Sequence, residues 1–213
     1  WYKVDIVSVQ GSSCTMFTKH PNTQIKSQPS DTKKASGFSL LELIVAVAIA
    51  GLLVAIAIPS FSDWLVKIRV DNEISSMHRL LLTARNTAIN MEQPVTICPL
   101  NGTTCNNNWK EEVTVFIDLN DNGVYESGSN ETIIRVKGKI DVNDKLVYPV
   151  ARLTYQPTGQ ASTGQSGAFQ YCPYAHSDKN RAVEVSPRGR MNQSSDTTGD
   201  DKDNLRNGTA VSC

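Results

Sequence analysis

Residues 37–59 read GFSLLELIVAVAIAGLLVAIAIP, the most apolar stretch of the chain. Between Phe38 and Ile58 only one of 21 residues is charged, Glu42. A helix of that length rises about 31 Å, which matches the hydrocarbon core of a bilayer. A carboxylate inside such a segment costs about 3 kcal/mol and marks a functional position that needs a partner. The stretch therefore predicts a membrane-spanning helix with a functional role for Glu42.

The segments on either side of this stretch differ in charge. Residues 1–37 carry five Lys and two Asp, whereas residues 38–213 carry 16 basic and 19 acidic side chains, a net charge of −3. The whole chain of 213 residues has no net charge, which excludes a protein that holds nucleic acid by overall basicity. The apolar run is too long for a secretory signal, and no small-residue cleavage site follows it. A plain membrane anchor leaves Glu42 unexplained.

The hexapeptide from Gly37 to Glu42 follows Lys33 and Lys34, precedes an apolar helix and resembles the class III signal of type IV prepilins and pseudopilins. The resemblance implies that a prepilin peptidase removes a leader, residues 1–37, on the cytoplasmic side and methylates the new N-terminus at Phe38. Met16 offers an alternative start with a shorter leader. In a filament the Glu42 carboxylate would pair with the α-amine of a neighbouring Phe38, so that neither charge is left bare.

Residues 59–93 are expected to continue the helix in amphipathic form. Apolar side chains recur at spacings of 4, 3, 4, 3 and 4, which places them on one helical face; they are Val70, Ile74, Met77, Leu81, Ala84 and Ala88. We expect this face to pack on a globular domain, Pro59 to kink the helix and Pro94 to end it. His78 has no second ligand one turn away and is expected to be an ordinary boundary residue.

Residues 94–213 are expected to form a β-rich globular domain. Short apolar or alternating runs predict strands at Val95–Cys98, Val113–Asp118, Thr132–Val136, Arg152–Tyr155, Ala168–Cys172 and Arg181–Ser186. The polar, acidic stretch 192–207 is predicted to be loop. The fold class is therefore α+β: a long N-terminal helix packed on a small antiparallel β-sandwich.

Four cysteines remain after loss of the leader, which removes Cys14. An even number in a domain outside the cytoplasm indicates disulfides. Three pairings exist, and proximity favours Cys98–Cys105 and Cys172–Cys213. A metal site built from Cys172 and His176 with the other cysteines is the less favoured alternative, because neither spacing is that of a zinc motif.

Two polar patches have alternative interpretations. Asp118, Asn120, Asn122 and Gly123 imitate the first half of an EF-hand loop, but a Ser stands where the bidentate Glu belongs, so a turn is favoured. Arg181, Arg188 and Arg190 lie within ten residues with one acid, Glu184. Guanidinium groups suit phosphates, so the arginines are candidates for DNA binding; an exposed strand end is the alternative.

Further motifs resemble the FimT/FimU/GspH group of minor pilins: Leu80–Ile89, the segment around Cys98 and Cys105, Trp109, Val115–Asp118 and Ile134-Arg135. The resemblance implies a pilin-like fold and a subunit that helps filament assembly at the tip with other minor and major pilins. Some members carry a GRxR motif for DNA capture. Gly189-Arg190-Met191 matches its first three positions, but Asn192 replaces the second Arg.

Three functions follow as hypotheses. The first is a minor type IV pilin, anchored in the inner membrane with a periplasmic domain, that serves pilus assembly, twitching and DNA uptake. The cysteine-bearing segment favours it over the second, a GspH-like pseudopilin of a type II secretion system. The third is an enzyme, but the sequence has no HExxH, GxSxG, phosphate-loop or dinucleotide motif. We therefore expect neither catalysis nor a cofactor, and no metal.

Overall fold

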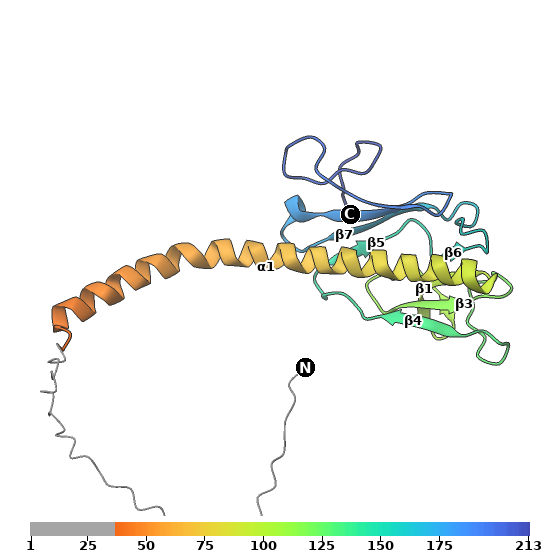
Figure 1. Ribbon diagram of the computed structural model, residues 1–213, viewed down its shortest axis with the longest axis horizontal. Coiled ribbons are helices and arrows are strands. Elements are labelled where there is room, and N and C mark those ends of the chain that lie inside the picture. Colours follow the sequence, from red (N-terminus) through yellow and green to blue (C-terminus); the bar gives the residue numbers. More distant parts are fainter. Residues whose placement is uncertain (1–36) are drawn as a thin grey trace, which may run out of the picture. The chain divides into compact units, whose positions relative to one another are not determined.

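The computed structural model describes residues 37–213, so the predicted leader lies outside the described residues apart from Gly37 (Figure 1). Helix α1, Leu40–Met91, contains 52 residues. Among the described residues no single helix is long and apolar enough to cross a membrane. One pair, Leu40–Ile56 and Phe61–Met91, bent by 40°, meets that condition by length and composition. The break contains Pro59, whose backbone lacks an amide hydrogen, so the predicted kink is confirmed.

The helix ends where the sequence predicts, just before Pro94. Glu92 has a left-handed backbone, with a φ of 54°. The amide of Gln93 donates to the carbonyl of Ala88 at 3.3 Å. A left-handed residue followed by such a bond is the usual way in which a helix C-terminus satisfies its free carbonyl groups. The chain then turns directly into the first strand.

The rest of the described chain forms two antiparallel sheets. The first has the order β2-β1-β3-β4, with β6 also paired to β1, and the second has the order β5-β7-β8-β9. The strands of the first sheet are β1 Val95–Asn101, β2 Thr104–Cys105, β3 Val113–Ile117, β4 Ile133–Lys137 and β6 Leu153–Tyr155; those of the second are β5 Lys145–Val147, β7 Gly167–Cys172, β8 Arg181–Val185 and β9 Met191–Gln193. A short 3-10 helix, η1 Ser177–Lys179, precedes β8.

All six predicted strands are present, as β1, β3, β4, β6, β7 and β8, with ends that differ by at most a few residues. The sequence did not predict β2, β5 or β9. The last of these corrects the prediction of loop from residue 192, because Asn192 and Gln193 pair with β8. These three strands have only two or three residues, and unlike the equally short β6 they do not show the alternation of apolar and polar residues that marks a strand. They form because a longer neighbouring strand offers hydrogen-bonding groups.

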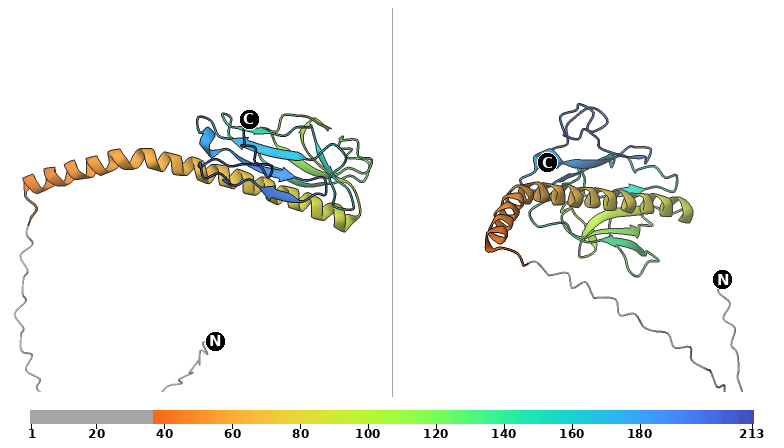
Figure 2. Two further views of the ribbon diagram at one scale, coloured as in Figure 1. Left: turned by 90° about the horizontal axis from the view of Figure 1, so that it is seen from above. Right: turned by 60° about the vertical axis from the view of Figure 1, so that its left-hand side comes forward.

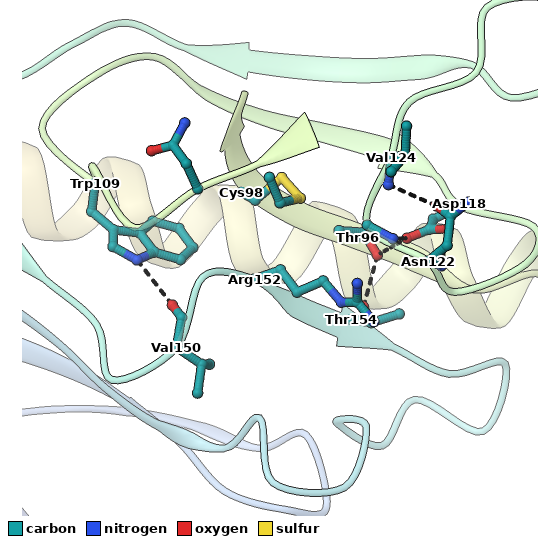
Figure 3. Close-up of a disulfide and its surroundings, with 12 residues drawn as sticks. Thr96, Cys98, Trp109, Asp118, Asn122, Val124, Val150, Arg152 and Thr154 are labelled. Atoms are coloured by element: carbon teal, nitrogen blue, oxygen red, sulfur yellow. Dashed lines mark hydrogen bonds between the residues drawn. A yellow bond between two sulfur atoms is a disulfide. The ribbon is translucent and has the colours of Figure 1, made fainter. Parts of the chain in front are cut away.

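The second half of α1 runs alongside both sheets (Figures 1 and 2), and its predicted stripe lies in the hydrophobic core. Its members are buried: Val70, Ile74, Met77, Leu81, Ala84 and Ala88, joined by Leu80. Trp109 packs edge-on against Phe169 with ring centroids 4.9 Å apart, and its indole Nε1 donates to the carbonyl of Val150 at 3.1 Å (Figure 3). The α+β class, a long helix packed on antiparallel sheets, is therefore confirmed. His78 is half-buried, as expected of a boundary residue.

Candidate functional site

The first turn of α1 places Glu42 by a local hydrogen bond. Ser39 precedes the helix, and its Oγ accepts the amide of Glu42 at 3.2 Å. This is the Ser-x-x-Glu spacing of a capping box, in which a side chain satisfies an amide that the helix leaves free. A negative side chain is also favourable near a helix N-terminus. Within residues 37–213, the Glu42 carboxylate has no cation within ion-pair distance, so it is available to a partner outside these residues.

The apolar segment that contains Glu42, residues 38–58, has its large side chains exposed in the single chain. Its exposed large side chains are Phe38, Leu40, Leu41, Leu43, Ile44, Val45, Val47, Ile49, Leu52, Leu53, Val54, Ile56 and Ile58. Exposure of an uninterrupted apolar surface in water is unfavourable, and a surface of this extent marks a membrane or protein contact. The segment is therefore a contact surface rather than part of the domain core.

The four described cysteines form the two predicted disulfides. Cys98 is bonded to Cys105, with Cα atoms 5.4 Å apart, and Cys172 is bonded to Cys213, with Cα atoms 6.2 Å apart. The first disulfide closes the β1–β2 turn, and the second joins β7 to the C-terminal residue. Because Cys172 is bonded to Cys213, it is not free to bind a metal with His176, as the alternative interpretation required.

Asp118 accepts hydrogen bonds from the backbone of its own loop, as expected if this patch is a turn rather than a calcium site. Its Oδ1 accepts the amide of Asn122 at 3.0 Å, and its Oδ2 accepts the amide of Gly123 at 2.9 Å and the hydroxyl of Thr96 at 2.7 Å (Figure 3). Asp118 is fully buried. A buried carboxylate must be hydrogen-bonded, and here amides and a hydroxyl of the protein occupy both oxygens. The Asp118 loop is therefore a structural turn.

Arg188 and Arg190 are exposed in the turn between β8 and β9. The amide of Gly189 donates to the Ser186 carbonyl at 2.8 Å, and the amide of Arg190 donates to Ser186 Oγ at 3.1 Å. Gly189 has a φ of +72°, in the region that glycine adopts without strain. The sequence thus places two cations on a turn of defined shape, which we call the arginine turn, residues 186–190.

The arginine turn is attached to the loop at Gly159. A Cβ atom on Gly189 would lie 1.9 Å from the carbonyl oxygen of Gly159, so this approach requires glycine. Arg85 of α1 donates from Nε to the same oxygen at 2.9 Å. Sequence reasoning missed Arg85, because no local pattern connects it with a turn more than 100 residues away. Close packing against Gly159 therefore explains why residue 189 is glycine, independently of any DNA-capture motif.

Arg181 lies at the other end of β8 and has acidic partners. Its guanidinium group is 2.7 Å from the carboxylate of Asp71 and 3.8 Å from that of Asp203. Between Arg181 and Val185, β8 alone advances the chain by about 13 Å before the arginine turn begins. The structure therefore brings Arg188 and Arg190 together in one turn and places Arg181 apart from them, in ion pairs.

Those ion pairs belong to a set that attaches both flanks of α1 to the two sheets. Asp71 reaches Arg181 of β8 on one flank. On the other, Glu73 lies 2.6 Å from the Nζ of Lys137 in β4. Arg69 lies one turn before Glu73 on that same flank, 3.3 Å from Asp144. Because residues two apart on a helix point to opposite flanks, Asp71 and Glu73 reach different sheets, β8 of the second and β4 of the first. Arg69 instead contacts Asp144, which directly precedes β5 of the second sheet.

Asp144 is the buried end of this set. Its side chain is fully buried and accepts hydrogen bonds from the hydroxyl of Tyr171 and, at 2.8 Å, from the amide of Tyr174. Burial first, and then the hydrogen bond to Asp144, raise the pKa of Tyr171 well above its usual range. The hydroxyl of Tyr171 therefore stays protonated and continues to donate to Asp144 at neutral and mildly alkaline pH.

Comparison with known proteins places these features in a family. The family described as type II transport protein GspH matches residues 73–189, and the prokaryotic N-terminal methylation motif matches residues 32–58. Two curated relatives, both named fimbrial protein, from Pseudomonas aeruginosa, are 42% identical over 57 residues, 27% of this chain and 36% of theirs. The chain thus spans about a third of the length of these relatives.

Solved structures with a similar arrangement include two pilin-like proteins. The type IV minor pilin FimU of Pseudomonas aeruginosa aligns with a TM-score of 0.45 and 20% identity over 59% of this chain and 92% of FimU. The minor pseudopilin EpsH of Vibrio cholerae aligns with a TM-score of 0.40 and 13% identity over 59% of this chain and 95% of EpsH. Because the GspH model matches more than half of the sequence, in the same chain as the methylation motif, the protein belongs to the GspH family, as the FimT/FimU/GspH motifs predict.

Proposed function

We propose that the protein is a minor subunit of a type IV pilus, processed at Gly37–Phe38 and assembled through its apolar helix in the inner membrane. The observation that carries the proposal is the exposed apolar segment with one charge in its first turn, directly after the cleavage motif. Such a helix is a structural part of a filament rather than a catalytic element. Prepilin peptidase and other pilins are the partners that this proposal requires.

The proposed role of Glu42 is to pair with the methylated amine of Phe38 in a neighbouring subunit. Its carboxylate has no ion-pair partner within residues 37–213, and the capping bond from its own amide to Ser39 holds it in the first turn. An unpaired charge among packed apolar helices is costly, whereas a pair of opposite charges offsets much of that cost. The pairing therefore favours one axial register between neighbouring helices.

Processing is tested by replacing Gly37 with Phe. A side chain at residue 37 would meet no other atom within 4 Å, so the change should act on the peptidase rather than on folding. Gly51→Leu is the matched control, because residue 51 is equally open. We expect intact-mass measurement to find methylated Phe38 in the parent and in the control, and uncut precursor for Gly37→Phe. A mature N-terminus elsewhere would refute the assignment.

A pseudopilin of a type II secretion system is the second candidate, because the matching family is described as a type II transport protein. The disulfide between Cys98 and Cys105 supports the pilus by the resemblance stated above. A deletion strain separates the two functions. Loss of pili and twitching with normal secretion supports the pilus, and loss of secretion with normal pili supports the pseudopilus.

DNA capture is the further role that we propose for the arginine turn. Arg188 and Arg190 are exposed, and Arg85 adds a third positive charge behind the turn through its bond to Gly159. Guanidinium groups form strong bonds with phosphate oxygens. Because the processed chain carries a net charge of −3, any affinity for DNA must come from such a local cluster. Binding is then expected to be weak, sequence-independent and sensitive to salt.

A further inference from the structure

A second apolar surface on α1 continues beyond the predicted membrane span. Phe61, Trp64, Leu65 and Ile68 are 57%, 54%, 47% and 36% exposed. Their spacing of i, i+3, i+4 and i+7 places them on one side of the helix, and the rings of Phe61 and Trp64 are 5.6 Å apart. We call these four side chains the outer stripe.

The outer stripe points away from the globular domain. At about 100° per residue, its members lie about 120–220° around the helix from Val70, which is buried in the core. Val66 and Ile74 point with Val70 toward the core. The domain packs on the opposite side, so it does not cover the outer stripe.

The height of the stripe matches the boundary of a bilayer whose core holds residues 38–58. Along the axis Phe61 lies about 4.5 Å and Trp64 about 9 Å beyond Ile58, and the headgroup layer extends about 5–8 Å beyond the core on each side. The 40° bend lowers Trp64 to about 7 Å when the first segment stands upright. Both aromatic rings then fall at the level of the headgroups.

A separate loop presents another aromatic side chain near the same level. Tyr174 is 68% exposed. Two residues later, His176 lies 3.7 Å from Asp63 of α1. The amide of Tyr174 is bonded to Asp144, which lies 3.3 Å from Arg69. Along the axis of α1, Tyr174 is therefore held between the positions of residues 63 and 69, at the same height as the outer stripe.

We propose that the outer stripe, with Tyr174, is a lipid-interface surface that sets the depth of the chain in the membrane before it joins a filament. The inference rests on the proposed anchoring of residues 38–58 in the bilayer. Trp and Tyr are enriched at the headgroup level because each combines an apolar ring with a polar group. Continuity with the exposed apolar segment favours lipid as the occupant over a second copy of the chain.

Bromine-labelled lipids test the depth of Trp64 directly, because bromine quenches tryptophan only at short range. The full chain with Trp1→Phe is reconstituted at low protein density into phosphatidylcholine vesicles that carry bromine high or low on the acyl chain. The variant Trp1→Phe with Trp64→Phe keeps only Trp109, which is buried, and supplies the background. Flotation of the vesicles shows whether the chain is anchored in the membrane, and quenching by bromine reports the depth of Trp64.

The matched control moves the tryptophan along the same face of α1. Leu82 is 37% exposed and lies 18 residues, five full turns, after Trp64. We expect bromine near the headgroups to quench Trp64 at least about twofold more than Leu82→Trp in the Trp64→Phe background. Bromine deep in the acyl chains should quench Trp64 less. Phe61→Ser with Leu65→Ser should reduce the quenching of Trp64 while flotation continues.

The outcomes distinguish the lipid-interface proposal for the outer stripe from the proposed anchoring of residues 38–58. A chain that floats but whose Trp64 is quenched no more than the background overturns the interface proposal and leaves the anchoring intact. Protection of Trp64 from both bromine and aqueous iodide, increasing with protein density, identifies a second copy as the occupant and also overturns it. A chain that does not float refutes the anchoring, and the interface proposal fails with it.

Discussion

Replacing Gly189 with Ala tests whether close backbone contact holds the arginine turn. The new Cβ atom would lie 1.9 Å from the carbonyl oxygen of Gly159 and 3.2 Å from Nε of Arg85. Because the first of these atoms belongs to the backbone, the two loops must separate, and the bond from Arg85 to Gly159 is strained or lost. Moreover, a φ of +72° disfavours any residue with a Cβ.

A control variant separates the two contributions to the loss of stability, the left-handed backbone and the clash with Gly159. Left-handed backbone costs a non-glycine residue about 1–2 kcal/mol, and forcing an extra carbon into a packed site costs about 1–3 kcal/mol more. Gly164 has a φ of +76° but nothing within 4 Å of its Cβ position, so Gly164→Ala carries only the first cost. Gly189→Ala should therefore destabilise the domain by about 1–3 kcal/mol more than Gly164→Ala.

Thermal unfolding of the detergent-solubilised chain, with disulfides intact, measures the difference. The near-ultraviolet circular dichroism of buried Trp109 reports on the core. At about 3 °C per kcal/mol, the Tm of Gly189→Ala should lie about 3–9 °C below that of Gly164→Ala. Equal Tm values for the two variants would show that Gly159 moves aside freely, and would refute the reasoning.

Three further predictions concern assembly, DNA and pH. Glu42→Ala should insert into membranes normally but be depleted from sheared filaments, since the neighbouring amine loses its partner; normal abundance on immunoblots contradicts the pairing. Arg188→Gln with Arg190→Gln should reduce the slope of log affinity for DNA against log salt by about 1.5, whereas Arg181→Gln, whose cation is already paired, should leave it unchanged. Because the pKa of Tyr171 is raised in the folded state, denaturant titration should find constant stability from this group below pH about 10, and falling stability above it. A Tyr171→Phe variant with the same alkaline profile as the parent would contradict this last prediction.

Local sequence patterns were sufficient for the helix and for its contact surfaces. The apolar run and the buried stripe each depend on residues within one or two turns of each other, so helical periodicity alone predicts them. The disulfides were also predictable, because Cys98 and Cys105 lie seven residues apart and left Cys172 and Cys213 as the second pair.

The candidate DNA site could be predicted only in part. Its three arginines are close in sequence, and this proximity suggested one patch. An extended strand separates Arg181 from Arg188 and Arg190, and the partner of Arg181 is Asp71, 110 residues earlier on α1. Sequence proximity does not predict spatial proximity along a strand, because each residue of a strand advances the chain by about 3.3 Å.

The sequence by itself therefore determined the apolar helix, the stripe that enters the core and six of the strands, because these features repeat with the period of their own secondary structure. The tertiary structure alone decided the approach of Gly189 to Gly159, the ion pairs on the two flanks of α1 and the short strands β2, β5 and β9. Arg85 and Gly159 are 74 residues apart, and Asp71 and Arg181 are 110 apart. Contacts at such separations exist only after the sheets have packed against the helix, and no local pattern of residues encodes them.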